Sequence, residues 1–135
     1  MKVVVDENAF VPVRAHSDDA GLDLKSPVDT WVHPGEHSII DTGVHVAIPT
    51  GYVGLITSKS GLMAKGLTCR GTIDSGYNGS IKAVLYNHAS EGYGVHRGEK
   101  VCQLVIMPII TPEIELVDAL EETERADGGF GSSGR

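Results

Sequence analysis

Apolar and polar residues alternate in short runs along most of this chain, which is the two-residue period of a half-buried β-strand. Val44, Val46 and Ile48 show the pattern, with His45 and Ala47 between them. A long helix needs a period near 3.6 and an uninterrupted run, whereas 17 glycines and 6 prolines break this chain repeatedly. The pattern therefore predicts strands as the main element.

Turn-forming sequences separate these runs. Pro-Gly, Pro-Thr-Gly and Asn-Gly occur at residues 34–35, 49–51 and 78–79, where they favour tight turns. We predict short strands at residues 2–5, 23–25, 30–33, 37–41, 43–48, 52–57, 67–69, 80–87, 101–107 and 113–117. Many short strands with regular turns indicate an all-β sandwich, barrel or jelly roll.

Residues 113–126 fit two patterns. Ile114, Val117 and Leu120 recur at a spacing of three, which favours a helix, but Ile114 and Leu116 also alternate as in a strand. We predict a strand followed by a loop or one turn. The glycine- and serine-rich residues 127–135 predict a flexible tail.

Composition places the chain among single-domain globular proteins, with 135 residues, 41% hydrophobic and 21% charged. No apolar run approaches the roughly 20 residues that cross a bilayer, and residues 1–6 are too short for a signal-peptide core. We therefore expect a cytoplasmic protein without a membrane partner. Cys69 and Cys102 lie far apart in the sequence, as expected of two buried thiols in a reducing compartment.

Net charge bears on the ligand. The value of -7 argues against a nucleic-acid polymer as partner. Residues 113–127 hold seven acidic residues and only one basic residue, Arg125, so the rest of the chain is close to neutral. An anionic small molecule can therefore bind to it.

Residues 58–61 are candidates for phosphate binding. Ser58, Lys59, Ser60 and Gly61 follow the strand predicted to end at Thr57. Backbone amides, two hydroxyls and an ammonium group together suit a phosphate. An ordinary serine-capped helical turn explains the same residues.

A glycine-flanked segment, residues 71–77, sets Asp74 in a predicted hairpin. A partly buried carboxylate there is a natural general base for a water molecule, whereas an exposed one is a turn cap. The ring of Tyr77, three residues later, can pack on a sugar or on the core.

The tail contains an isolated aromatic residue. Phe130 lies among glycines and serines, so no local core can hold it, and a ligand ring or a partner subunit is the alternative to a disordered end. Arg125, Ser132, Ser133 and the glycine amides could surround phosphate oxygens.

Taken together, these segments resemble the trimeric deoxyuridine triphosphatase (dUTPase) family over nearly the whole chain. Five motifs of that family occur in order, at residues 20–24 (AGLDL), 58–62 (SKSGL), 71–79 (GTIDSGYNG), 98–104 (GEKVCQL) and 125–134 (RADGGFGSSG). Each is short, but five in register is a specific signal.

The resemblance implies an all-β jelly-roll protomer of the dUTPase-like β-clip type at residues 1–124. It implies a flexible glycine-rich C-terminal arm at residues 125–135, which closes over the site of a neighbouring subunit. It also implies a homotrimer with shared sites, and Mg²⁺-dependent hydrolysis of dUTP to dUMP and pyrophosphate.

The resemblance also implies roles for individual residues. Asp74 would activate water, Tyr77 would lie under the deoxyribose and exclude a 2′-hydroxyl, and Asp23 would reach Mg²⁺ through water. The remaining substrate-binding residues would be Lys59, Ser60, Gly61, Gly71, Thr72, Ile73, Lys82, Gln103, Arg125, Phe130, Gly131 and Ser132. The backbone of residues 71–73 would read the uracil edge, and Phe130 would stack on uracil.

One departure and two alternatives matter. Lys59 stands where the family usually has arginine, so a planar two-point phosphate contact becomes a point charge. A dCTP deaminase shares the fold and parts of the motifs. A trimeric protein that uses the nucleotide to gate an interaction is the non-enzymatic alternative.

Overall fold

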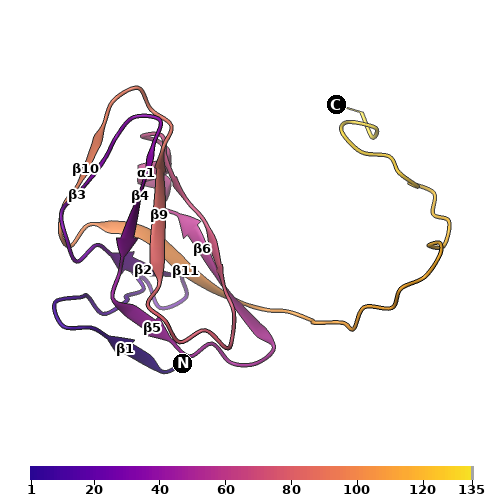
Figure 1. Ribbon diagram of the computed structural model, residues 1–135, viewed down its shortest axis with the longest axis horizontal. Helices are drawn as coiled ribbons and strands as arrows, with labels where there is room; N and C mark the ends of the chain where they lie inside the picture. Colours follow the sequence, from indigo (N-terminus) through magenta and orange to yellow (C-terminus); the bar gives the residue numbers. More distant parts are fainter. Residues whose placement is uncertain (135) are drawn as a thin grey trace.

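Residues 1–134, described here by a computed structural model, form eleven short β-strands and one four-residue helix (Figure 1). The elements in chain order are β1 (Val3–Val5), β2 (Gly21–Lys25), β3 (Thr30–Val32), β4 (His37–Asp41), β5 (Val44–Val46), β6 (Tyr52–Ser58), α1 (Ser60–Met63), β7 (Leu67–Cys69), β8 (Gly71–Ile73), β9 (Lys82–Asn87), β10 (Tyr93–Val95) and β11 (Lys100–Pro108). That one helix is far too short to cross a membrane, and no other helix occurs in residues 1–134.

The strands form a jelly roll of antiparallel sheets, as predicted from the alternation and the turns. A four-stranded sheet has the order β2-β11-β6-β8, and a three-stranded sheet has the order β4-β9-β7. Two ribbons, β1-β5 and β10-β3, complete the body. β11 is the longest strand, and it pairs with β2 on one side and β6 on the other. The prediction of an all-β fold is confirmed.

The core lies between the sheets and takes the alternate residues of each strand. Val44 and Val46 are buried, while His45 between them faces outward, as the period of two requires. Cys69 and Cys102 are buried free thiols in the same core. The largest fully buried apolar side chains are Leu24, Ile40, Leu67, Ile81, Leu85 and Leu104. Burying each contributes about 1.5–3 kcal/mol to folding.

Two strands were not predicted, and one predicted strand is absent. β8 and β10 each have three residues and contain glycine, so their alternation is too brief to detect. The strand predicted at residues 113–117 is wrong, because the chain there is irregular. Ile114 and Leu116 are 97% and 95% exposed, so neither a neighbouring strand nor a core covers them within one chain.

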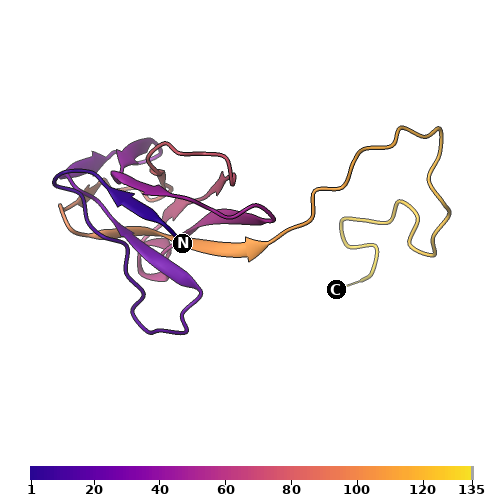
Figure 2. The same cartoon turned by 90° about the horizontal axis from the view of Figure 1, so that it is seen from below.

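Residues 109–134 follow β11 and include most of the arm predicted at residues 125–135. Figures 1 and 2 show this whole segment, called the arm from here on, reaching away from the sheets. Ile114, Leu116, Leu120 and Phe130 are all exposed along it. Ile109 N–H still donates to Gly51 O in the body, and the later backbone hydrogen bonds are local turns, such as those from Gly128 N–H to Arg125 O and from Ser132 N–H to Gly129 O. Exposed apolar side chains of this kind indicate that the arm contacts another molecule.

Candidate active site

A cavity of about 250 Å³ opens beside the turn that follows β8. β8 pairs with β6, placing Gly71 opposite Ile56 and Ile73 opposite Gly54. Asp74 then begins a turn in which its carbonyl accepts a hydrogen bond from Tyr77 N–H at 3.1 Å. Asp74 is exposed within one chain, so the partial burial expected of a general base is not present there. The cavity is lined by Ile56, Arg70, Gly71, Thr72, Ile73, Asp74, Tyr77, Ser80, Lys82 and Val84. Six of the predicted site residues therefore line a single cavity.

Tyr77 is held in place at this cavity. Its hydroxyl donates to the carbonyl of Ser80 at 3.0 Å, and the side chain remains partly exposed. Gly79 lies directly against the ring, since a Cβ at this position would come within 2.3 Å of the Tyr77 hydroxyl oxygen. A side chain at residue 79 would therefore displace the ring.

A second group of predicted residues gathers around Asp23 on β2. Its carboxylate is almost completely buried and accepts two ammonium contacts, from Lys59 Nζ at 2.5 Å and Lys100 Nζ at 2.7 Å. Gln103 lies directly opposite Asp23 on β11, and its side-chain amide donates to the carbonyl of Ser58 at 3.3 Å. The group carries two positive charges around one negative charge, which suits an anion.

An irregularity in β11 explains how Lys100 reaches Asp23. The pairing with β2 shifts register between Lys100 and Cys102, as in a β-bulge. The extra residue changes the parity of the strand, so Lys100 and Gln103 face the same side although they are three positions apart. Lys100 was missed by the sequence analysis, because a bulge cannot be read from alternation.

The surroundings of Asp23 lower its pKa. Burial is the largest influence and raises the pKa, but the hydrogen bonds from Lys100 and Lys59 and the charges of both groups together outweigh it. A lowered pKa in the folded state stabilises the fold above the ordinary aspartate value of 3.8, and this stabilisation is lost as the pH falls below it.

We expect Asp23→Asn to lower the free energy of unfolding by roughly 1–3 kcal/mol, because the two ammonium groups lose their common partner but can turn toward solvent. Asp41→Asn is the matched control. Asp41 contacts Lys82 at 3.8 Å with both side chains about half exposed, and such surface pairs contribute little. Denaturant unfolding at pH 7 compares the two, and equal losses would contradict the special role of Asp23.

Ser60 and Gly61 begin the short helix α1. Lys59 is its N-cap residue and makes no side-chain capping hydrogen bond, so the alternative of a serine-capped turn is wrong. The space around Gly61 is open, with no atom within 4 Å of the position that a Cβ would occupy. The hydroxyl of Ser58, in contrast, bonds to both the N–H and the carbonyl of Cys69, which ties β6 to β7.

The group around Lys59 and Lys100 offers one carboxylate, that of Asp23, to a metal ion. Residues 1–134 contain no cluster of three or more His, Cys, Asp or Glu side chains that could hold a metal ion. Asp23 is a single carboxylate, but each of its oxygens has a second lone pair beside the lysine contact. This fits a metal that is bound mainly by phosphates and touches the protein through water.

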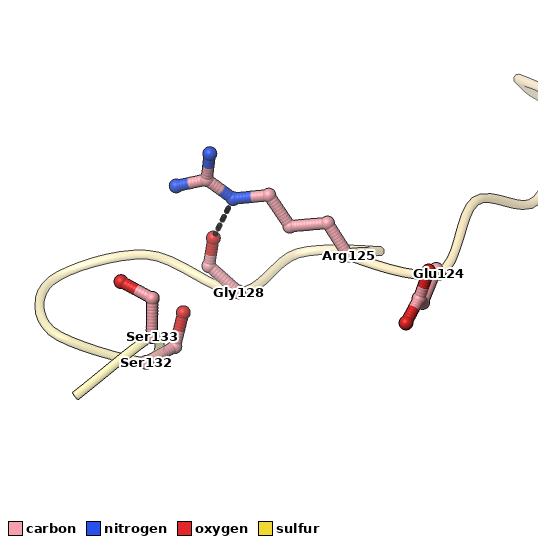
Figure 3. Close-up of a pocket in the computed structure, with 5 residues that line it drawn as sticks. All are labelled: Glu124, Arg125, Gly128, Ser132 and Ser133. Atoms are coloured by element: carbon pink, nitrogen blue, oxygen red, sulfur yellow. Dashed lines mark hydrogen bonds between the residues drawn. The ribbon is translucent and has the colours of Figure 1, made fainter.

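The arm holds the last predicted group. Arg125, Ser132 and Ser133 line a concavity of about 500 Å³ on the arm itself, and Figure 3 shows their side chains around the local turn. Arg125 Nε donates to the carbonyl of Gly128 at 2.8 Å, which leaves its two terminal nitrogens free of contacts among the residues drawn (Figure 3). Phe130 is fully exposed, and Gly131 follows it at a positive φ of 90°.

One chain keeps these three groups apart. Ile73 pairs with Gly54 and Gly71 with Ile56, whereas Lys59 follows the end of that strand. These partners lie two to four strand positions before Ser58, which is about 7–13 Å of rise. The arm extends away from the sheets that carry both groups (Figures 1 and 2).

The fold and these groups define an all-β protein with a cationic edge around Asp23 and a separate hairpin cavity. The model of the dUTPase family matches residues 7–134. The deoxyuridine 5'-triphosphate nucleotidohydrolase of Clostridium tetani is 41% identical over 98% of this chain and 94% of its own length. The human mitochondrial protein of that name is 39% identical over 97% of this chain and 53% of its own length. The chain belongs to the dUTPase family.

Solved structures agree with this assignment. The dUTPase of Staphylococcus bacteriophage 80alpha, solved with dUpNHpp, is 36% identical, with a TM-score of 0.92 over 99% of this chain and 98% of its own. A mutant dUTPase from an S. aureus phage is also 36% identical, with a TM-score of 0.82 over 90% of this chain and 98% of its own. That study describes a structural Mg(II) ion.

Proposed function

We propose that this protein hydrolyses dUTP to dUMP and pyrophosphate, with Asp74 as the general base. The observation that carries the proposal is the hairpin cavity, because Asp74, Tyr77 and the backbone of β8 open into the same space. The Asp74 carboxylate accepts a proton from a water molecule, whose oxygen bonds to the α-phosphorus. The bond from that phosphorus to the bridging oxygen breaks, and pyrophosphate leaves.

The base is read by backbone groups of β8. This strand is at the edge of its sheet, since it pairs with β6 on one side only, so its other edge has unpaired N–H and carbonyl groups. Gly71, Thr72 and Ile73 present these groups at the cavity. Cytosine offers a donor where uracil offers an acceptor, so a fixed backbone edge can distinguish the two.

The phosphates lie on the cationic groups. Lys59, Ser60, Gly61 and Gln103 bind the triphosphate at the Asp23 edge, and Lys82 adds a positive charge at the hairpin cavity. Asp23 would hold Mg²⁺ through water, and the metal would neutralise part of the charge of the triphosphate.

The enzyme works as a homotrimer with sites shared between subunits. Three groups of residues that one chain holds apart must meet around one nucleotide. In a cyclic assembly, each site can take one group of residues from one subunit and the other groups from its neighbours. Every site is then complete, and all sites are identical. The exposed Ile114, Leu116 and Leu120 supply apolar surface for such contacts.

Tyr77→Ala is expected to raise the relative rate on UTP by tenfold or more, because the ring no longer occupies the space of a 2′-hydroxyl. Tyr52→Ala is the control, since Tyr52 is 42% exposed and Tyr77 is 41% exposed. The ratio of kcat/KM for dUTP and UTP measures the effect. An unchanged ratio in Tyr77→Ala would remove this residue from sugar discrimination.

A pyrophosphate-release assay across the deoxynucleoside triphosphates tests the function directly. Release from dUTP alone supports the proposal, whereas ammonia release from dCTP would identify a deaminase. The deaminase is not favoured, because the family model and the relatives are dUTPases.

The buried free thiols of Cys69 and Cys102 support a reducing, cytoplasmic location.

A further inference from the structure

His45 joins the N-terminal segment to the turn of the hairpin cavity. It lies on β5, on the face opposite the core, and its side chain is 28% exposed. Its Nδ1 is 2.8 Å from the carbonyl oxygen of Asn78, and its Nε2 is 3.1 Å from Oδ1 of Asp6. One ring therefore connects two segments that are far apart in the sequence.

The contact between His45 and Asn78 joins the turn at residues 75–79 to the body of the fold. Residues 75–79 make three hydrogen bonds within residues 1–134. Two of them are internal to the hairpin, from Tyr77 N–H to Asp74 O and from the Tyr77 hydroxyl to Ser80 O. The third joins Asn78 to His45. The backbone is anchored again at Ile81, whose N–H donates to Val44 O at 2.8 Å.

The partners of the ring fix its protonation state. A carbonyl oxygen and an ionised carboxylate oxygen can only accept hydrogen bonds, so both nitrogens must donate for both contacts to form. Only the imidazolium form of His45 does so. A neutral ring loses one of the two bonds and turns a lone pair toward an oxygen.

The charges around the ring favour the imidazolium form. Asp6 faces it from the segment after β1 and Asp41 from the end of β4, while Lys2 lines the same groove and opposes them. Asp41 itself contacts Lys82. The pKa of His45 is raised, first by the Asn78 carbonyl and then by Asp6.

We propose that the His45 imidazolium is a positioning residue, which holds the turn at residues 75–79 through the Asn78 carbonyl and thereby fixes Tyr77 and Asp74 at the cavity. The hold weakens when the ring loses its proton. The effect on dUTP turnover rests on the proposed function, but the order of the hairpin does not. Because the pKa is raised in the folded state, both bonds are present below the ordinary histidine pKa, and the hold weakens as the pH rises through the raised value, where the neutral ring can keep only one of them.

Two amide variants separate the contacts. His45→Asn keeps an N–H donor near the position of Nδ1, whereas His45→Gln places its donor near the position of Nε2. We expect His45→Gln to speed hydrogen exchange of the Tyr77 amide and to raise KM for dUTP, each by about tenfold, as for the loss of one hydrogen bond. His45→Asn is expected to stay within about twofold of the unmodified protein in both measurements.

The pH dependence provides the second readout. In the unmodified protein, protection of the Tyr77 amide should fall as the pH rises through the pKa of His45, beyond the intrinsic change in exchange rate. In His45→Asn this additional fall should be absent. A pH titration followed by nitrogen NMR should show that both ring nitrogens of His45 keep their protons to a pH above the ordinary histidine value of 6.5, and it tests the proposal without any substitution.

Three results would overturn the proposal: equal exchange in the two variants, the same pH dependence in His45→Asn, or a ring that loses its second proton at or below the ordinary histidine value of 6.5. Failure of the proposed function would look different. If the unmodified protein did not hydrolyse dUTP but the exchange pattern followed the expected order, the hold of His45 on the hairpin would stand without its catalytic consequence.

Discussion

Asp74→Asn is expected to lower the rate of pyrophosphate release from dUTP by about 10²–10⁴-fold, the usual contribution of a general base. The amide is close to the carboxylate in size, so the turn and the cavity keep their shape. It cannot accept the proton of the attacking water. Binding of dUTP should therefore be nearly unchanged, because the other residues of the cavity remain in place.

Single-turnover pyrophosphate release and equilibrium binding of dUpNHpp separate the two effects. Glu36→Gln is the control, since Glu36 is an exposed carboxylate in the turn between β3 and β4. It should leave both measurements unchanged. Near-normal turnover by Asp74→Asn would reject Asp74 as the base, and an equal loss of binding would indicate a structural role instead.

The sequence predicted the body of the fold well, because alternation and turn residues are local signals. The strand at His37–Asp41 was predicted at its observed bounds, and the predicted end of residues 43–48 differs from β5 by two residues. The strand at residues 113–117 was predicted wrongly for a physical reason. Ile114 and Leu116 alternate as in a strand, but a strand needs a neighbour, and one chain has none there.

The residues of the candidate site could likewise be predicted from the sequence only where the signal is local. Asp74 and Tyr77 could be found from the sequence because they lie within one short hairpin. Lys100 and His45 could not, because each acts on a residue distant in the chain. Lys100 depends on a bulge in β11, and His45 reaches Asn78 across 33 residues. Contacts of this kind follow from the register between strands.

Removal of residues 128–135 is expected to lower dUTP turnover by about 10²-fold or more, because the arm would no longer exclude bulk water from the site or contact the phosphates. The melting temperature should change little. Phe130 is fully exposed, and the backbone hydrogen bonds of this segment are local, so its removal takes nothing from the core. A large fall in melting temperature would show that the arm is structural.

Mixing this truncated protein with Asp74→Asn tests whether the sites are shared. Each variant alone is nearly inactive, but the truncated subunit has an intact Asp74 and the other has an intact arm. If an arm closes over a neighbour's cavity, random mixed trimers at equal amounts contain both parts in roughly a quarter of their sites. Unfolding and refolding the two proteins together should then restore about that share of activity, while refolding them separately and mixing them without exchange should not. Absence of recovery in verified mixed trimers would mean that each arm closes on its own chain, and the apolar residues along it would then need another partner.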